Sequence, residues 1–309
     1  MGLPFKLVYD DRYDLHLGEH VFPSQKYRLV RQALLDDSVA APGDFLPPEP
    51  ALDEDVLRVH TREYVRKLKT GTLSYMEQLR LEIPFSPELI DAVWMAAGGS
   101  ILSGRLALGE SLAVNIGGGF HHAFADHGEG FCVIHDVAIA IRRLQAEKGI
   151  ATAMVIDTDV HQGNGTAAIF SGDPAVYTFS IHQANNYPYP KPPSNVDIEL
   201  PDGTGDVDYL ARLESHLVRA FDEFHPDLLF YLAGADPYRE DQLGGLALTL
   251  DGLRRRDRLV FEMARGRGVP VAVTLAGGYA RRVEDTVRIH VNTIVAAREV
   301  ALESAGHTR

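Results

Sequence analysis

Three polar side chains that can hold a metal ion follow one apolar segment of the chain. The stretch 155–166 reads VIDTDVHQGNGT, so Asp157, Asp159 and His161 are spaced by two residues directly after a strand-like run. If the extended geometry continues, all three point to the same side of the strand. Such a group is costly to bury without a cation, and carboxylate and imidazole suit a borderline metal such as Zn²⁺. The alternative is a pair of capping aspartates and a surface histidine.

Three further clusters of chemically active residues follow apolar runs. The segment 117–130, GGGFHHAFADHGEG, places His121 and His122 in a glycine-rich loop, where an imidazole can act as a general base. Asp236 follows an apolar run, and so does Tyr279, whose phenol can stabilise an oxyanion. Taken singly, these are also typical of loop histidines, a common strand-end aspartate and a packing tyrosine. Together they favour a catalytic metal site, because a catalytic zinc keeps three protein ligands and one open position.

The elements that must position these clusters alternate between strands and helices. Short apolar runs, mostly continuous as in strands covered on both faces, lie at 113–116, 151–156, 175–181, 228–233 and 270–275. Amphipathic stretches with helical spacing lie at 87–108, 133–147, 207–224, 250–265 and 281–302. This alternation predicts an α/β fold with a parallel sheet, in which ligands gather at the carboxyl ends of the strands. We expect residues 1–309 to form a single domain, with the proline-rich segments 40–50 and 187–194 as surface loops.

Composition narrows the class of protein. The chain has 309 residues and a net charge of −13, which argues against binding nucleic acid and fits basic substrates, although acidity can also serve solubility alone. A single cysteine, Cys132, suits a reducing compartment. No apolar run is long enough to cross a bilayer, and the start of the chain lacks the layout of a secretory signal. We therefore expect a cytoplasmic protein without membrane insertion, and the sequence does not indicate its oligomeric state.

The order of these motifs resembles that of the zinc histone deacetylases and their acetylpolyamine-hydrolase relatives. The resemblance rests on Gly-Gly-Phe-His-His, Gly-Phe-Cys, Asp-x-Asp-x-His-x-Gly-x-Gly, Gly-Ala-Asp and Gly-Gly-Tyr, and it runs from Val59 to Tyr279. It implies a three-layer arginase/deacetylase-type fold around a mostly parallel eight-stranded sheet. It also implies hydrolysis of an acyl amide, foremost an N-ε-acyl-lysine of a protein or peptide. The alternatives are an amidohydrolase for acetylpolyamines or other small acylated amines and, less favoured, a non-catalytic acyl-lysine or metal-binding module.

Site residues follow from the resemblance position by position. The implied metal ligands are Asp159, His161 and Asp236, with Zn²⁺ or Fe²⁺ both open as the ion in the cell. The implied catalytic residues are His121 with Asp157, His122 with Asn164, and Tyr279. The implied substrate tunnel is lined by Phe120, Gly130, Phe131, Tyr187 and Tyr189. A structural K⁺ would be held by Asp157, Asp159, His161 and Ser180. Arg28 matches an arginine near an internal acetate channel, or is a solvated helix residue.

One departure points to a branch of the family. Many deacetylases have a second aspartate where this chain has Asn164, and both His-Gln-Gly-Asn-Gly and the segment 17–23 resemble class IV-like proteins. An amide carries no charge, so His122 should be less basic than beside a carboxylate. This branch implies a preference for long fatty acyl groups, with Phe85, Trp94 and the 187–189 loop as candidate pocket residues. Glu82 and Glu88 are candidate anchors for a free diamine instead.

Overall fold

One parallel sheet runs through the centre of the molecule. The computed structural model describes residues 2–305, and within that range eight strands pair in parallel in the order β2-β1-β3-β8-β7-β4-β5-β6. The strands are β1 (Lys6–Val8), β2 (Phe45–Leu46), β3 (Leu112–Asn115), β4 (Ala153–Asp157), β5 (Val176–Gln183), β6 (Val196–Leu200), β7 (Leu228–Leu232) and β8 (Val271–Thr274). The expected α/β fold with an eight-stranded sheet is therefore confirmed.

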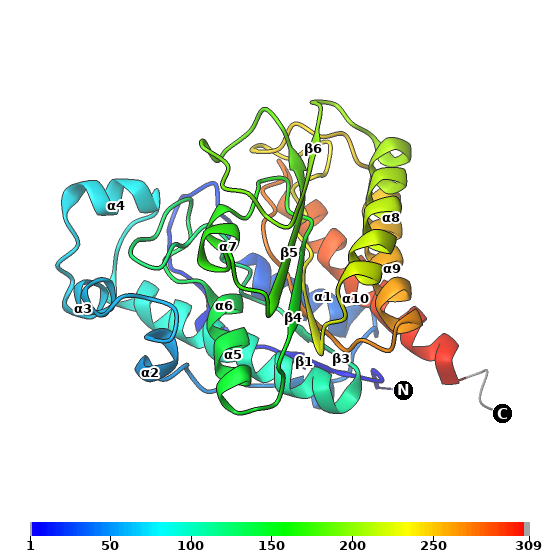
Figure 1. Ribbon diagram of the computed structural model, residues 1–309, viewed down its shortest axis with the longest axis horizontal. Coiled ribbons are helices and arrows are strands. Elements are labelled where there is room, and N and C mark those ends of the chain that lie inside the picture. The colour runs from blue at the N-terminus through cyan, green and yellow to red at the C-terminus, as the bar shows by residue number, and fades with distance from the viewer. Residues whose placement is uncertain (1, 306–309) are drawn as a thin grey trace.

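Helices cover both faces of this sheet. Figure 1 shows α5 and α6 on one side, and α8, α9 and α10 on the other, where α1 packs against α10. The helices are α1 (Lys26–Asp36), α2 (Asp53–Val56), α3 (Arg62–Thr70), α4 (Tyr75–Leu81), α5 (Pro87–Glu110), α6 (Asp136–Ala146), α7 (Asn164–Ile169), α8 (Asp206–Glu223), α9 (Leu250–Gly266) and α10 (Val283–Ala305), with short 3₁₀ turns η1 (Asp11–Tyr13) and η2 (Pro42–Asp44). Among the described residues, no helix is long and apolar enough to cross a membrane.

Local sequence explains where the main elements begin and how closely they pack. Helix α5 starts at Pro87, and the Ser86 side chain caps it by accepting a hydrogen bond from the Leu89 amide. Gly98 of this helix packs closely against the loop that contains Glu49. A Cβ at position 98 would lie 1.8 Å from the Glu49 carbonyl oxygen, so a side chain does not fit there. The central strands are fully buried, as their continuous apolar runs predict.

Four neighbouring strands lead into the chemically active clusters. In the sheet β3, β8, β7 and β4 are adjacent, and the segments after them carry the histidine pair, Tyr279, Asp236 and the Asp157–His161 stretch respectively. Because parallel strands end at the same edge, four segments far apart in sequence meet there. The fold thus places all four clusters at one edge of the sheet.

Candidate metal site and its surroundings

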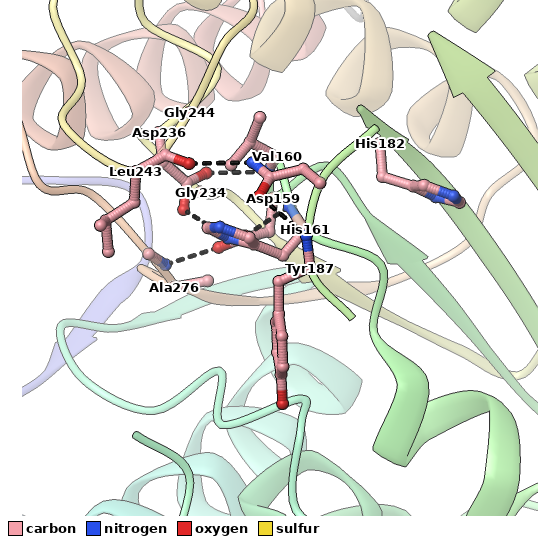
Figure 2. A network of polar contacts seen from close by, with 12 residues as sticks. Asp159, Val160, His161, His182, Tyr187, Gly234, Asp236, Leu243, Gly244 and Ala276 are labelled. Carbon is pink, nitrogen blue, oxygen red and sulfur yellow. Dashed lines mark hydrogen bonds and ion pairs between the residues drawn. The ribbon is translucent and has the colours of Figure 1, made fainter. Parts of the chain in front are cut away.

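Asp159, His161 and Asp236 form one buried group. Asp159 and His161 follow β4, and Asp236 follows the neighbouring strand β7. One ligand atom from each residue lies within 4.8 Å of the others. His161 Nδ1 is 3.0 Å from Asp159 Oδ1 and 3.6 Å from Asp236 Oδ2, and Figure 2 shows the three side chains together. The structure therefore brings the three implied metal ligands together.

The chemistry of this group fits a divalent cation. Asp236 Oδ1 accepts a hydrogen bond from the Val160 amide at 2.8 Å, but its buried Oδ2 accepts none from residues 2–305. Burial and the charge of Asp159 raise the pKa of Asp236 to about 7. Burial would lower the pKa of His161, yet the hydrogen bond to Asp159 and the nearby Asp236 carboxylate raise it to about 10. A pocket of nitrogen and oxygen donors that favours positive charge suits Zn²⁺ or Fe²⁺.

The two adjacent histidines have different electrostatic environments. Their rings lie 4.0 Å apart; His121 Nδ1 is 2.6 Å from Asp157 Oδ2, and His122 Nδ1 is 2.7 Å from Asn164 Oδ1. Burial would lower the pKa of His121, but the Asp157 carboxylate raises it to about 9. Burial and the neighbouring His121 charge hold the pKa of His122 well below its ordinary value. The pair thus combines an imidazole beside a carboxylate with one beside a neutral amide, as an acid and a base with different roles require.

Asp136, the first residue of α6, holds the loop that carries these histidines. Its buried carboxylate accepts hydrogen bonds from the Gly119 amide at 3.0 Å and the Phe120 amide at 2.8 Å, and the Ser100 hydroxyl donates a third. These bonds satisfy backbone groups that would otherwise be buried without partners. The loop conformation is therefore fixed by the start of a helix rather than by the metal ligands.

Arg256 supports the other side of the site from α9. The fully buried guanidinium donates to the Gly234 carbonyl oxygen at 2.6 Å and to the Thr158 carbonyl oxygen at 3.3 Å, and pairs with Asp257. Both carbonyl groups lie within two residues of a candidate metal ligand. This buried cation thereby ties the ends of β4 and β7 together.

A small cavity lies between the histidines and Tyr279. Its volume is about 20 Å³, room for about one water molecule. The Tyr279 ring makes T-shaped contacts with the rings of Phe22 and Phe131, and its backbone amide donates to Asp241 at 2.7 Å. The cavity is lined by Phe22, Tyr27, Gly118, Gly119, Phe120, His121, His122, Gly130, Phe131, Cys132, Asp159, Ala276, Gly277 and Tyr279. Of the expected tunnel residues, Phe120, Gly130 and Phe131 line it directly.

The remaining expected tunnel residues differ from one another. Tyr187 presents its ring edge to His122, with centroids 4.9 Å apart, and so extends the wall of the site. Tyr189 is 70% exposed, packs with Lys191 and does not line the cavity. Trp94 does not line the cavity either. Its indole N–H donates a hydrogen bond to Asp53, the first residue of α2. Phe85 likewise does not line the cavity.

The arginine expected near an internal channel is not buried. Arg28 is exposed on α1, and Lys26 is the buried cation of this helix. Lys26 Nζ donates to the Ala276 carbonyl oxygen at 2.8 Å and lies 5.8 Å from the centre of the Tyr279 ring. Burial lowers its pKa to about 8. The spacing of Lys26 with Val30 and Leu34, at i+4 and i+8, marks the buried face and could have identified it.

Two further placements complete the site. Ser180 lies on β5 in register with Asp157 on β4, and its hydroxyl is 2.9 Å from His182 Nδ1. Glu129, which the motifs did not single out, accepts a hydrogen bond from the Asn164 side chain at 2.6 Å. Its only sequence signal is a charged residue between two glycines next to the Gly-Phe-Cys motif.

Comparisons with known proteins agree with one family. The model of the histone deacetylase domain matches residues 20–294. An uncharacterised protein of Picosynechococcus sp. is 42% identical, covering 97% of this chain and all of that protein. Histone deacetylase 2 of Arabidopsis thaliana is 31% identical, covering 91% of this chain and 77% of that protein.

Solved structures show the same architecture. The HDA15 HD domain superposes with a TM-score of 0.77 at 24% identity, covering 97% of this chain and 93% of that one. An HDAC homologue complexed with SAHA superposes with a TM-score of 0.81 at 23% identity, covering 96% and 84%. At these identities the superpositions support the fold.

Proposed function

This chain belongs to the histone deacetylase family, and from that premise we propose that it hydrolyses N-ε-acyl-lysine in peptides or proteins with a divalent metal, Zn²⁺ or Fe²⁺. The observation that carries the proposal is the meeting of Asp159, His161 and Asp236 with two unlike histidines and a tyrosine around one small cavity. Metal-dependent hydrolysis of an acyl amide uses these three elements: a cation, an acid–base pair and an oxyanion donor.

Each residue has a role that its surroundings support. A cation held by Asp159, His161 and Asp236 supplies Lewis-acid activation of the amide carbonyl and of a water molecule. The neutral His122 accepts the proton of that water, since burial keeps its imidazole uncharged. His121, protonated beside Asp157, donates a proton to the departing amine. Tyr279, at the cavity wall, donates a hydrogen bond to the oxyanion.

Lysine in a peptide suits the mouth of the site better than a free diamine. A diamine substrate needs a buried acidic anchor for its distal ammonium group. Glu82 and Glu88 are both exposed, so neither can desolvate such a group. The net charge of −13 still attracts basic peptides over a longer range.

The cavity beside the candidate catalytic residues has no extension for a long acyl chain. A volume of about 20 Å³ leaves no continuous apolar space for a fatty chain, and the expected pocket residues Phe85 and Trp94 lie elsewhere. We therefore expect kcat/KM to fall from acetyl to myristoyl on one lysine peptide, against the class IV expectation. A rise with chain length would show that the cavity opens when substrate binds.

One experiment tests the reaction and the metal together. The protein, purified under anaerobic conditions, is assayed for bound metals and for turnover of an acetyl-lysine peptide and of acetylated polyamines. We expect about one Zn²⁺ or Fe²⁺ per chain, faster turnover of the peptide, and loss of both metal and turnover in Asp236→Ala. Full activity in metal-free protein would refute the proposed site, and faster turnover of the polyamines would favour the alternative substrate class.

Two secondary proposals accompany this function. A structural K⁺ near Asp157, Asp159, His161 and Ser180 is supported by the register of β4 with β5, which places Asp157 and Ser180 side by side. A cytoplasmic location is supported by the single cysteine, Cys132, which is buried and cannot form a disulfide within the chain.

A further inference from the structure

A chain of hydrogen bonds leads from the general base His122 to Glu129, a half-buried glutamate next to the cavity residue Gly130. His122 Nδ1 is 2.7 Å from Asn164 Oδ1, and Asn164 Nδ2 donates to Glu129 Oε1 at 2.6 Å. The Gly165 amide also donates to Asn164 Oδ1, at 3.0 Å. Glu129 and the Gly165 amide therefore define the orientation of the Asn164 side chain: the NH₂ group faces Glu129, and the carbonyl oxygen faces Gly165.

The orientation of this amide decides which nitrogen of His122 carries the proton. A carboxylate can only accept hydrogen bonds, so Glu129 must face the NH₂ end of Asn164, and the carbonyl end must face His122. A carbonyl oxygen can only accept, so His122 Nδ1 is protonated and Nε2 keeps its lone pair. The reversed amide would present NH₂ groups to Nδ1 and select the opposite tautomer, in which Nε2 cannot accept a proton.

A carboxylate at position 164 would not need this help. The two oxygens of an aspartate are equivalent acceptors, so either one selects a protonated Nδ1. The two ends of an asparagine differ, and a partner must choose between them. Burial would raise the pKa of Glu129, but hydrogen bonds from His127, Tyr187 and Asn164 lower it, which keeps the group an acceptor.

Glu129 also anchors one wall of the site. The Tyr187 hydroxyl donates to the same Glu129 Oε1 at 2.6 Å, while the Tyr187 ring lies edge-on to His122. Figure 2 shows the Tyr187 side chain with its hydroxyl end pointing away from the candidate metal ligands. The neighbouring Gly130 allows this approach, because a Cβ there would lie 2.9 Å from His122 Cδ2 and 3.0 Å from Tyr187 Cε1.

We propose that Glu129 is a positioning residue that orients the Asn164 amide, thereby holds His122 in the tautomer with a free Nε2, and anchors Tyr187 beside it. The catalytic consequence rests on the proposed function, whereas the tautomer does not. Glu129 touches neither the candidate metal ligands nor the reacting atoms, and acts through Asn164.

Two variants of Glu129 separate orientation from simple packing. In Glu129→Gln the Oε1 atom can still accept from both Asn164 and Tyr187, so kcat should stay within about threefold of the original protein. Glu129→Leu keeps the bulk but has no acceptor, so kcat should fall at least about tenfold, with less change in KM and unchanged metal content. Asp126→Leu, an exposed carboxylate lost from the same loop, is the matched control and should leave kcat unchanged. Equal kcat in the Leu and Gln variants would overturn the proposal.

The same Glu129 variants, made in a protein that also carries Asn164→Asp, test whether Glu129 acts on His122 through Asn164. In Asn164→Asp the tautomer no longer depends on Glu129, and two carboxylates face each other. Adding Glu129→Gln to that background should therefore raise kcat, and adding Glu129→Leu should not lower it. A loss from Glu129→Leu of the same size in both backgrounds, or no gain from Glu129→Gln, would mean that Glu129 acts by packing alone.

Nitrogen NMR reads the tautomer without any substrate. In ¹⁵N-histidine-labelled, metal-loaded protein, His122 should show a protonated Nδ1 and an unprotonated Nε2, both in the original chain and in Glu129→Gln. In Glu129→Leu the Nε2–H tautomer should become populated. An unchanged tautomer in that variant would overturn the inference. A shifted tautomer in a protein that hydrolyses no acyl-lysine would refute the proposed function alone.

Discussion

Gly277 lies between the two carboxylates of the candidate metal site, and the absence of a side chain lets them approach each other. A Cβ at this position would lie 2.1 Å from Asp236 Oδ2 and 2.3 Å from Asp159 Oδ2. Gly277→Ala should therefore displace both carboxylates and weaken metal binding about 10–100-fold, measured by competition with a chelator. Gly109→Ala is the control, since no atom lies within 4 Å of its added Cβ. Unchanged metal affinity in Gly277→Ala would contradict the assigned ligands.

The hydroxyl group of Tyr279 is the proposed hydrogen-bond donor to the oxyanion. Its ring is held by Phe22 and Phe131, so replacing the hydroxyl alone leaves the packing intact. Tyr279→Phe should lower kcat on the order of 10²–10³-fold while metal content and melting temperature stay the same. A kcat near that of the original protein would mean that the tyrosine only packs.

At this scale, the sequence predicted residues that belong to motifs and missed those placed by tertiary contacts. Asp159, His161 and Asp236 could be grouped because each follows a strand of the same sheet. Tyr187 and Tyr189 were both expected in the tunnel because nothing in the local sequence distinguishes an exposed loop tyrosine from one beside the site. Glu129 was missed because its significance depends on Asn164, 35 residues away.

At the scale of elements, helix α9 supports the candidate metal site through one buried side chain, although it lies far from Asp159 in the sequence. Arg256 is fully buried between the carbonyl oxygens of Thr158 and Gly234 and its partner Asp257. Arg256→Leu removes the cationic partner of buried Asp257, which keeps only hydrogen bonds from the Tyr231 and Thr293 hydroxyl groups, so the free energy of unfolding should drop by about 3–5 kcal/mol in urea denaturation. Arg254, also on α9, forms a half-exposed ion pair with Glu299 on α10, and Arg254→Leu should cost no more than about 1 kcal/mol. Equal costs would show that burial of Arg256 is unimportant.

The elements themselves were predicted where the apolar pattern is long. The runs at 113–116, 151–156, 175–181, 228–233 and 270–275 correspond to β3, β4, β5, β7 and β8, and the five amphipathic stretches to α5, α6, α8, α9 and α10. The strands β1 and β2 have three and two residues, too few for a periodic signal. The strand β6 alternates polar and apolar residues at the sheet edge, so it lacks the continuous run of the inner strands.

At the scale of the whole molecule, buried neutral histidines make stability depend on pH. Burial lowers the pKa of His60 to about 4, whereas an unfolded chain titrates near 6.5. Between these values the unfolded state binds more protons, so stability is lost as the pH falls below about 6.5. From pH 7 to pH 5 this one group should cost about 2 kcal/mol.

The variant His60→Gln isolates that contribution. Between pH 7 and pH 5 its free energy of unfolding should fall by about 2 kcal/mol less than that of the original protein. Urea titrations at pH 7 and at pH 5 measure this difference. His216, a half-buried histidine on α8, is the control, and His216→Gln should follow the original protein. Parallel losses in all three proteins would exclude His60 as a source of acid instability.

The position of β8 in the sheet has a consequence for synthesis of the chain. This strand, Val271–Thr274, lies between β3 and β7, and it leads directly into Gly277 and Tyr279. While the ribosome is still making the preceding residues, β3 and β7 have no strand to join them, and their apolar edges stay open to other chains. The sheet therefore closes only after β8 has been made, and a chain that stops before residue 271 lacks both a closed sheet and Tyr279.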